Sequence, residues 1–277
     1  MKIIDCFTFF NELEILELRF NELYDYVDTF VIVESTKTHT GLDKELVFSN
    51  NINQFSKFLD KVTHVVVDDL PTYKKSSCGT IDWVPENFQR NAISRGLDRC
   101  AEPGDIILVS DCDEIWDPRS ANPVFSKIRN MQKSERVLYG NNLRYTFMQA
   151  GCFFYINTRQ PQDWWGTAMA IYGAFDSCQH LRNTRCNVKN IVNPGGWHFS
   201  YQGGASRIYK KVQNIAESSE IVDKFGTEFD IQNKILNLID PWGRSGINIK
   251  EEKDYLPEYI TTFTKKYPSF VYNFGRG

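Results

Sequence analysis

The feature that most constrains this chain is a short apolar run that ends in three carboxylates. Residues 106–109 are all apolar, which predicts a buried strand. Asp111, Asp113 and Glu114 follow at the point where that strand reaches the surface. A buried carboxylate without a partner costs several kcal/mol, and clustered carboxylates also repel one another. A divalent cation removes both penalties, so the run predicts a cation site at the edge of an α/β sheet.

Magnesium or manganese suits such a site because both ions prefer hard oxygen ligands and both bind substrate phosphates. The Asp-x-Asp arrangement of Asp111 and Asp113 at a strand end is therefore a candidate site for a metal ion and a diphosphate. An acidic loop, or a helix N-terminus that attracts carboxylates, is the alternative interpretation of the same residues. The strand that precedes them favours the metal.

Length and composition limit the classes of protein to consider. The 277 residues suffice for one large α/β domain or two small ones. Hydrophobic residues make up 42% of the chain, enough for a sizeable core, and the many aromatic rings either pack there or form platforms for sugars. The net charge is −3 and no long basic run occurs, so we do not expect a nucleic-acid partner.

No apolar stretch approaches the roughly 20 residues needed to cross a bilayer, so no membrane span is predicted. The N-terminus carries only Lys2 before a short strand-like segment that Asp5 interrupts, which is not the pattern of a signal peptide. The seven cysteines include no Cys-x-x-Cys pair, and their number is odd. We therefore expect reduced thiols in a cytoplasmic protein, and we do not expect zinc.

Strands and helices alternate in the first part of the chain. Apolar runs predict strands at 2–7, 29–34, 62–67 and 105–109. Helical spacing of apolar residues predicts helices at 11–24, with Asn11 as the N-cap, and at 86–100. This alternation indicates βαβ units around a mostly parallel sheet, in which ligands bind beyond the carboxyl ends of the strands. The expected strand ends carry acidic residues, namely Glu34, Asp68, Asp69, Asp111 and Asp113.

The pattern changes after Glu114. Residues 136–156 predict two strands with a turn at 149–151, and 186–192 is a further strand candidate. From Ala205 onward the pattern is mostly helical and is broken by prolines. We interpret residues 1–277 as a single domain with three parts, a nucleotide-sugar-binding half, an acceptor half and a helical C-terminal cap, at 1–115, 116–204 and 205–277.

Several residues outside the acidic run are candidates for the site. His198 follows two glycines, and it supplies a third metal ligand opposite Asp113 if the chain returns to the sheet there. A structural histidine held by ordinary hydrogen bonds is the alternative. Arg90 suits a diphosphate, although an ion pair with Glu86 one helical turn away is equally compatible with the sequence. The tryptophans that either stack on a sugar or pack in the core are Trp164, Trp165 and Trp197.

Four sequence blocks resemble glycosyltransferase family 17, and they occur in the order typical of that family. They are Asp5-Cys6-Phe7 with Phe9-Phe10-Asn11-Glu12, the stretch Val31-Ile32-Val33-Glu34-Ser35, the acidic stretch at 110–115, and Gly196-Trp197-His198. The resemblance implies an α/β fold of the GT-A type, with a Rossmann-like, mostly parallel central sheet flanked by helices. It also implies a UDP-sugar donor, a divalent metal (Mn²⁺ or Mg²⁺) and inversion at the anomeric carbon.

The resemblance also assigns roles to individual residues. Asp111 and Asp113 are similar to the carboxylates that hold the metal and the donor diphosphate, and His198 to a further metal ligand. The residues expected near the donor are Phe9, Asn11, Glu34, Arg90 and Asp111. The acceptor implied is an oligosaccharide or a glycoprotein.

The implied reaction is a single displacement, in which a carboxylate outside the metal cluster removes the proton from the attacking acceptor hydroxyl. Asp163 is the first candidate for this base, because the two tryptophans that follow it suit an acceptor platform. Glu217 and Glu220 are the alternatives.

Two other classes of protein stay open. A magnesium-dependent nucleotidyltransferase also uses paired aspartates at a strand end, but residues 7–11 lack the Gly-rich phosphate loop expected near its first strand. A non-catalytic, metal-dependent carbohydrate-binding protein is the other. The donor sugar is N-acetylglucosamine or another such as xylose, and the oligomeric state is open. Because the anchor and stem of the animal members of the family are missing, we expect an enzyme of a bacterial cell or a virus-infected host cell.

Overall fold

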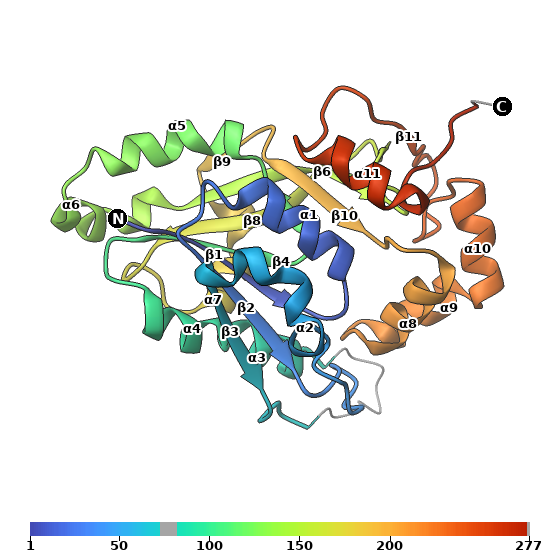
Figure 1. Cartoon of the computed structure of the whole chain (residues 1–277), viewed down its shortest axis with the longest axis horizontal. Helices are drawn as coiled ribbons and strands as arrows, with labels where there is room; N and C mark the ends of the chain where they lie inside the picture. Colours follow the sequence, from blue (N-terminus) through green and yellow to red (C-terminus); the bar gives the residue numbers. More distant parts are fainter. Residues whose placement is uncertain (73–81, 276–277) are drawn as a thin grey trace.

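The computed structural model describes residues 1–72 and 82–275, except for the side chains of Ser219 and Glu220. A large, mostly parallel central sheet carries helices on both faces (Figure 1). This arrangement confirms the α/β architecture of the GT-A type that the sequence predicts.

Four parallel strands form the N-terminal half of the sheet. They are β1 (Ile3–Phe9), β2 (Thr29–Ser35), β3 (Val62–Val67) and β4 (Ile106–Asp111). Their order in the sheet is β3-β2-β1-β4. The four strands predicted from apolar runs are confirmed, with shifts of only one or two residues at their ends.

This strand order produces a crevice at the edge of the sheet, beyond the ends of β1 and β4. After β1 the chain adds β2 on one side, whereas β4 pairs with the other side of β1. A crevice opens beyond the carboxyl ends of two strands whose connections leave in opposite directions. Thr8 of β1 lies opposite Asp111 of β4 in this register, so the acidic run reaches that crevice.

The second half of the sheet is mixed. β8 (Trp164–Ile171) runs antiparallel to β4, and β6 (Tyr145–Phe153), β10 (Gly196–Ser200) and β5 (Glu114–Trp116) follow in that order. β9 (Asn190–Val192) pairs with β6, and β7 (Thr158–Arg159) pairs with β11 (Lys250–Glu251) in a small separate sheet. Because β8 is antiparallel, its first residues lie near the carboxyl end of β4.

Two predicted strands after Glu114 are corrected by the structure. The segment 136–156 begins with α6 (Lys133–Leu138) and the 3₁₀ helix η2 (Gly140–Leu143), and then forms one strand rather than two. Gly151 lies within that strand. A Cβ at this position would lie 2.1 Å from the Gln160 side chain, so the glycine permits close packing and does not form a turn. In the segment 186–192 a 3₁₀ helix, η3 (Arg185–Asn187), precedes the short strand β9.

Each face of the sheet buries its own set of side chains. On one face lie α1 (Leu13–Leu23), α5 (Pro118–Arg129), α2 (Val47–Asn50) and the 3₁₀ helix η1 (Ile52–Lys61), whose apolar residues form one core. The other face is covered by α3 (Val84–Asn91), α4 (Ile93–Cys100) and α7 (Cys178–Asn183) (Figure 1). Successive residues of β1 and β2 alternate between these two cores, as the period of a strand requires.

Two predicted helices differ in detail from the structure. The predicted helix at 86–100 is interrupted at Ala92, whose N–H is shared between the carbonyls of Phe88 and Gln89, as in a tighter 3₁₀ turn. Asn11 does not cap α1. Glu12 precedes the helix, and its carboxylate accepts the N–H groups of Phe10 and Asn11 instead.

The chain after Ala205 is mostly helical, with α8 (Ala205–Asn214), α9 (Ser218–Phe225), α10 (Glu228–Leu236), α11 (Ile260–Lys266) and the 3₁₀ helix η4 (Pro268–Phe270). The first three helices form a small core of their own with Phe153, Phe154 and Tyr201. Phe263 of α11 belongs to the main core, so the C-terminal segment packs in two places.

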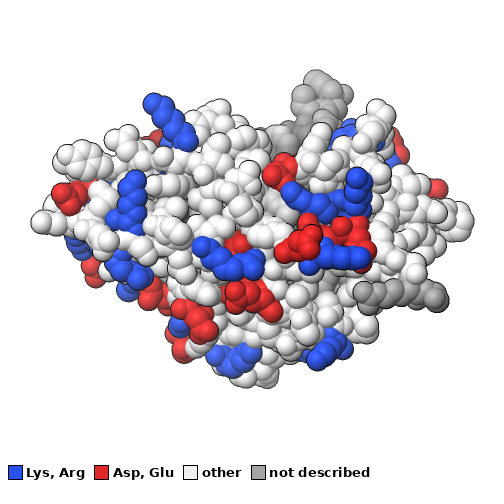
Figure 2. All heavy atoms as spheres, turned by 90° about the horizontal axis from the view of Figure 1, so that it is seen from above, with Lys and Arg blue, Asp and Glu red and all other residues white. Residues whose placement is uncertain are grey.

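Charged side chains of both signs are interspersed on the face that Figure 2 shows. No extended patch of a single sign covers that face, which is not the footprint of a nucleic-acid surface. Within the described ranges, none of the helices combines the length and the apolar character that a membrane crossing requires.

A buried ion pair joins α1 to the central strands. The guanidinium of Arg19 donates to both carboxylate oxygens of Asp5, at 2.7 and 2.8 Å, and both side chains are fully buried. It also donates to Ser110 Oγ and to the backbone carbonyls of Asp111, Cys112 and Glu114. One side chain therefore fixes the path of the backbone through the acidic run.

Replacing Arg19 with methionine is expected to lower the free energy of unfolding by about 3–5 kcal/mol, because Asp5 then stays buried without its partner. Urea unfolding followed by circular dichroism measures the change. Arg99→Met is the matched control, since Arg99 is exposed on α4. Equal unfolding midpoints for the two variants would contradict the role given to Arg19.

Candidate active site

The main cavity lies beyond the carboxyl ends of β1, β2 and β4 and has a volume of about 670 Å³. This is within the size range of sites that hold small molecules. Its lining includes seven basic residues, Lys37, Lys44, Arg90, Arg182, Arg185, Lys211 and Arg244. Five acidic residues also line it, Glu12, Glu86, Asp111, Asp113 and Glu217. Basic side chains thus outnumber acidic ones on the lining, although Glu34, Glu114 and Asp240 pair with three of them from outside it.

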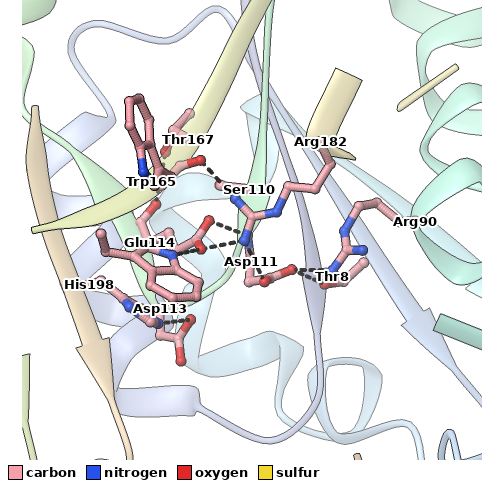
Figure 3. Close-up of polar contacts among 12 residues, drawn as sticks. Thr8, Arg90, Ser110, Asp111, Asp113, Glu114, Trp165, Thr167, Arg182 and His198 are labelled. Atoms are coloured by element: carbon pink, nitrogen blue, oxygen red, sulfur yellow. Dashed lines mark hydrogen bonds and ion pairs between the residues drawn. The ribbon is translucent and has the colours of Figure 1, made fainter. Parts of the chain in front are cut away.

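Asp111 ends β4 and is held by two arginines (Figure 3). Arg90 donates to Asp111 Oδ1 at 2.9 Å and Arg182 donates to Oδ2 at 2.9 Å, while Thr8 Oγ1 lies 3.2 Å from Oδ1. Burial opposes ionisation of this carboxyl, but Arg90 and Arg182 outweigh burial and hold its pKa well below the usual range. Both carboxylate oxygens of Asp111 are therefore engaged by guanidinium groups.

Asp113 turns the other way, toward His198 (Figure 3). Its Oδ1 lies 3.7 Å from His198 Nε2, and both side chains are largely buried. β10 brings His198 there by pairing with β5, with His198 opposite Glu114 and Gly196 opposite Trp116. Gly196 is required at this crossing, since its φ is +122° and a Cβ would lie 2.1 Å from the Ile115 carbonyl oxygen. The chain thus returns to the sheet at His198, as expected.

The site partly fits a divalent cation. An imidazole nitrogen and a carboxylate oxygen 3.7 Å apart are close enough to share one ion, which then takes its other ligands from phosphate and water. Asp111 faces the two arginines, which engage both of its oxygens, so its part as a further ligand stays a prediction. Among the described residues no group of three or more histidine, cysteine or acidic side chains is arranged to hold a metal. Of the three predicted ligands, the structure brings together Asp113 and His198.

Glu114, the third acidic residue of the run, is fully buried. One of its oxygens accepts from Trp164 Nε1 at 2.6 Å and pairs with Arg182, and the other accepts the N–H of Asp111 at 3.2 Å. The same arginine therefore neutralises both Glu114 and Asp111. The sequence analysis missed Arg182 because α7 is far from the acidic run in sequence, although clustered carboxylates signal that basic partners must come from elsewhere.

Arg185 is a second basic residue that the sequence analysis missed. Its guanidinium lines the cavity and donates to the backbone carbonyls of Trp165 and Arg182 at 2.5 and 2.7 Å. Burial and the charge of Arg182 lower the pKa of Arg185 to about 10. The negative charge of an anion bound in the cavity would offset both effects, so Arg185 is well placed to bind phosphate.

The residues predicted to lie near the donor take different positions. Phe9, Arg90 and Asp111 line the cavity. Glu34 is fully buried and accepts hydrogen bonds from Lys44 Nζ at 3.1 Å and from the N–H of Phe48 at 3.0 Å. It therefore positions Lys44, which lines the cavity, without lining the cavity itself. Asn11 lines a smaller cavity next to Asp113.

The three candidate bases also differ in their position relative to the cavity. Glu217 lines the main cavity. Asp163 forms an ion pair with Arg159 and lies outside the described lining. The side chain of Glu220 lies outside the described part of the structure.

The three tryptophans proposed as platforms have different environments. The Trp164 indole lines the cavity, is 37% exposed and packs against the His198 ring, with 4.9 Å between ring centroids. Trp197 is fully buried and donates to the backbone carbonyl of Tyr255, so it belongs to the core. Trp165 lies outside the described lining of the cavity. Of these three tryptophans, Trp164 is the one that lines the described cavity.

Comparison with known proteins gives matches over much of the chain. The model of glycosyltransferase family 17 matches residues 1–237. The β-1,4-mannosyl-glycoprotein 4-β-N-acetylglucosaminyltransferases of Rattus norvegicus and Homo sapiens are each 29% identical to this chain over 119 residues. These alignments cover 41% of this chain but 21% of the rat protein and 22% of the human protein. The chain thus matches about a fifth of the length of these relatives.

Replacing Asp111 with asparagine is expected to lower the free energy of unfolding by about 2 kcal/mol near neutral pH, because Arg90 and Arg182 lose their shared carboxylate. The value is below that of a fully buried pair because the Asp111 side chain is 34% exposed. The pKa of Asp111 is depressed, so its ionised form stabilises the fold above the ordinary aspartate value of 3.8. That contribution is lost as the pH falls below 3.8 toward the lower pKa of the folded state.

Urea unfolding at a series of pH values tests this prediction. The difference between the wild type and the Asp111→Asn variant should shrink as the solution is acidified. Asp25→Asn is the control, since Asp25 is exposed on the surface. A difference that stays constant over the acid range would contradict the ion-pair assignment.

Proposed function

The chain belongs to glycosyltransferase family 17, and from this premise we propose that it moves a sugar from a UDP-sugar to a hydroxyl of a glycan acceptor. We propose N-acetylglucosamine as the sugar, because the curated relatives are named for its transfer. Inversion at the anomeric carbon and dependence on Mn²⁺ or Mg²⁺ are part of the same proposal. The acceptor in this proposal is an oligosaccharide or a glycoprotein.

The observation that carries the proposal is the group of three arginines in the cavity beyond β1 and β4. Arg90, Arg182 and Arg185 lie together on its lining, and Asp111 holds the first two in place. Guanidinium groups bind phosphate oxygens in paired hydrogen bonds. A nucleoside diphosphate fits this combination of charge, volume and position at the switch point of the sheet.

The chain's own residues suggest how such a reaction proceeds. The arginines hold the diphosphate and stabilise the negative charge that grows on it as the glycosidic bond breaks. A cation held by Asp113 and His198 would add Lewis-acid stabilisation of the same charge. Trp164 offers an apolar face to a sugar ring, and enclosure in the cavity orients the acceptor hydroxyl for attack.

Release of UDP from UDP-N-acetylglucosamine, with Mn²⁺ and with or without acceptor glycans, tests the function. Asp113→Asn is expected to lower turnover at least about 100-fold, because charge on the leaving group is then stabilised less. Asp254→Asn, on the exposed surface, is the control and should retain turnover.

The outcomes separate the alternatives. Turnover in the Asp113→Asn variant equal to that of the wild type would contradict a metal-binding role of Asp113. Binding of a sugar without any release of UDP would indicate a carbohydrate-binding protein, and release of pyrophosphate from UTP and a sugar phosphate would indicate a nucleotidyltransferase. The anomeric configuration of the product, read by proton NMR, tests inversion.

We propose Glu217 as the base that deprotonates the acceptor, since it lines the cavity and Asp163, the other candidate whose side chain is described, does not. Glu217→Gln is expected to lower transfer by about 10²–10⁴-fold with little change in the affinity for UDP, because a base acts on the acceptor and not on the nucleotide. Asp163→Asn is the matched comparison and should retain most activity, since Asp163 is paired with Arg159. Loss of transfer in the Asp163 variant alone would reverse this assignment.

A further inference from the structure

Asp113 has a cation of the chain's own beside it. The ammonium group of Lys211, on α8, lies 2.9 Å from Asp113 Oδ2 and 3.6 Å from Glu12 Oε1. We propose that Lys211 is a resident counter-ion of Asp113 that a divalent cation must displace, so that metal and donor diphosphate bind together rather than separately. This inference rests on the proposed function, because it concerns the same cation and the same donor.

The Lys211 position is built into the fold. The Asp113 side chain is 7% exposed and that of Lys211 is 20% exposed, so their contact is not an ordinary surface pair. Arg207, one turn earlier on α8, donates to both oxygens of Glu14 on α1 at 2.6 and 3.0 Å. This bidentate pair docks α8 on α1 and brings Lys211 over the acidic run.

Further acceptors line a small cavity that Lys211 also lines. This cavity, beside Asp113, is lined by Lys211, Glu12, Asn11 and Gln202. Asn11 Oδ1 and Gln202 Oε1 are buried and accept no hydrogen bond within the described structure. The Glu12 carboxylate is fixed by the N–H groups of Phe10 and Asn11. An ammonium with three donors can therefore leave Asp113 and still be satisfied in this cavity.

Charge balance explains why the exchange depends on the donor. With Lys211 in contact, the charge of Asp113 is already compensated, and a divalent cation arriving alone adds repulsion to the ammonium. A diphosphate brings negative charge to the cavity that both Lys211 and Asp113 line. The divalent cation then gains oxygen ligands, and the excess positive charge is neutralised. Metal binding should consequently be weak alone and much tighter with UDP.

Titration of Mn²⁺ followed by electron paramagnetic resonance, with and without UDP, measures this coupling without any turnover. Lys211→Met keeps the length of the side chain and removes its charge. We expect it to bind Mn²⁺ without UDP at least about tenfold more tightly than the wild type does, because no ion pair has to be broken. The factor by which UDP tightens Mn²⁺ binding should fall in the same variant.

Lys210→Met removes a charge from the exposed side of the same helix and should leave Mn²⁺ binding unchanged. Lys211→Arg keeps the charge, so its binding of Mn²⁺ alone should stay weak. Thermal melting of each variant checks that it is folded, and Lys211→Gln replaces the methionine variant if the latter does not fold. Affinity for Mn²⁺ alone that is unchanged or lower in the neutral Lys211 variants, including no binding at all, would overturn the inference.

The two proposals fail in different ways. If Lys211→Met binds Mn²⁺ more tightly but the protein turns over no UDP-sugar, the counter-ion role of Lys211 is supported and the transferase reaction is refuted. If the protein turns over UDP-sugar but that variant binds Mn²⁺ as the wild type does, the transferase reaction is supported and the counter-ion role of Lys211 is refuted.

Discussion

The structure depends on the neutralisation of three carboxylates at the end of β4. Burial of Asp113 and Glu114 beside the partly exposed Asp111 would be prohibitive without opposite charge nearby. Arginines supply this charge to Asp111 and Glu114, and Lys211 supplies it to Asp113. Arg19, which is itself paired with Asp5, holds the backbone of the run from α1, whereas Arg90 approaches from α3 and Arg182 from α7. Because these helices cover opposite faces of the sheet, the acidic run ties both cores to the cavity.

The two aspartates of the Asp-x-Asp run have separate roles as a result. Asp111 is the last residue of β4 and faces the arginines, whereas Asp113 lies in the turn that follows and faces β10. One aspartate thus organises the groups that suit a diphosphate, and the other stands beside the imidazole of His198. A two-residue spacing across the end of a strand produces this division because the backbone leaves the extended conformation between them.

Local patterns in the sequence predicted much of the fold and part of the site. Apolar runs located β1 to β4, and the family resemblance placed His198 near Asp113, where the structure also has it. Gly151 was interpreted as part of a turn, yet it serves the packing of Gln160 against a continuous strand. Arg182 and Arg185 could not be found from spacing, since they lie about 70 residues beyond the carboxylates and reach them only through the antiparallel pairing of β8 with β4. Charges that meet across a sheet leave no periodic signal in the chain.

The helical segment after Ala205 completes the cavity rather than merely covering it. Lys211 and Glu217 both come from this segment, which has its own small core and is joined to α1 through Arg207 and Glu14. Lys211, which pairs with Asp113, lies on α8, and Glu217 lies at the start of α9. Exchange of Lys211 for a metal at Asp113 would loosen one of the charged contacts that hold α8 in place. Under the proposed exchange, binding of a metal and a diphosphate is coupled to the position of the helical segment that carries Glu217.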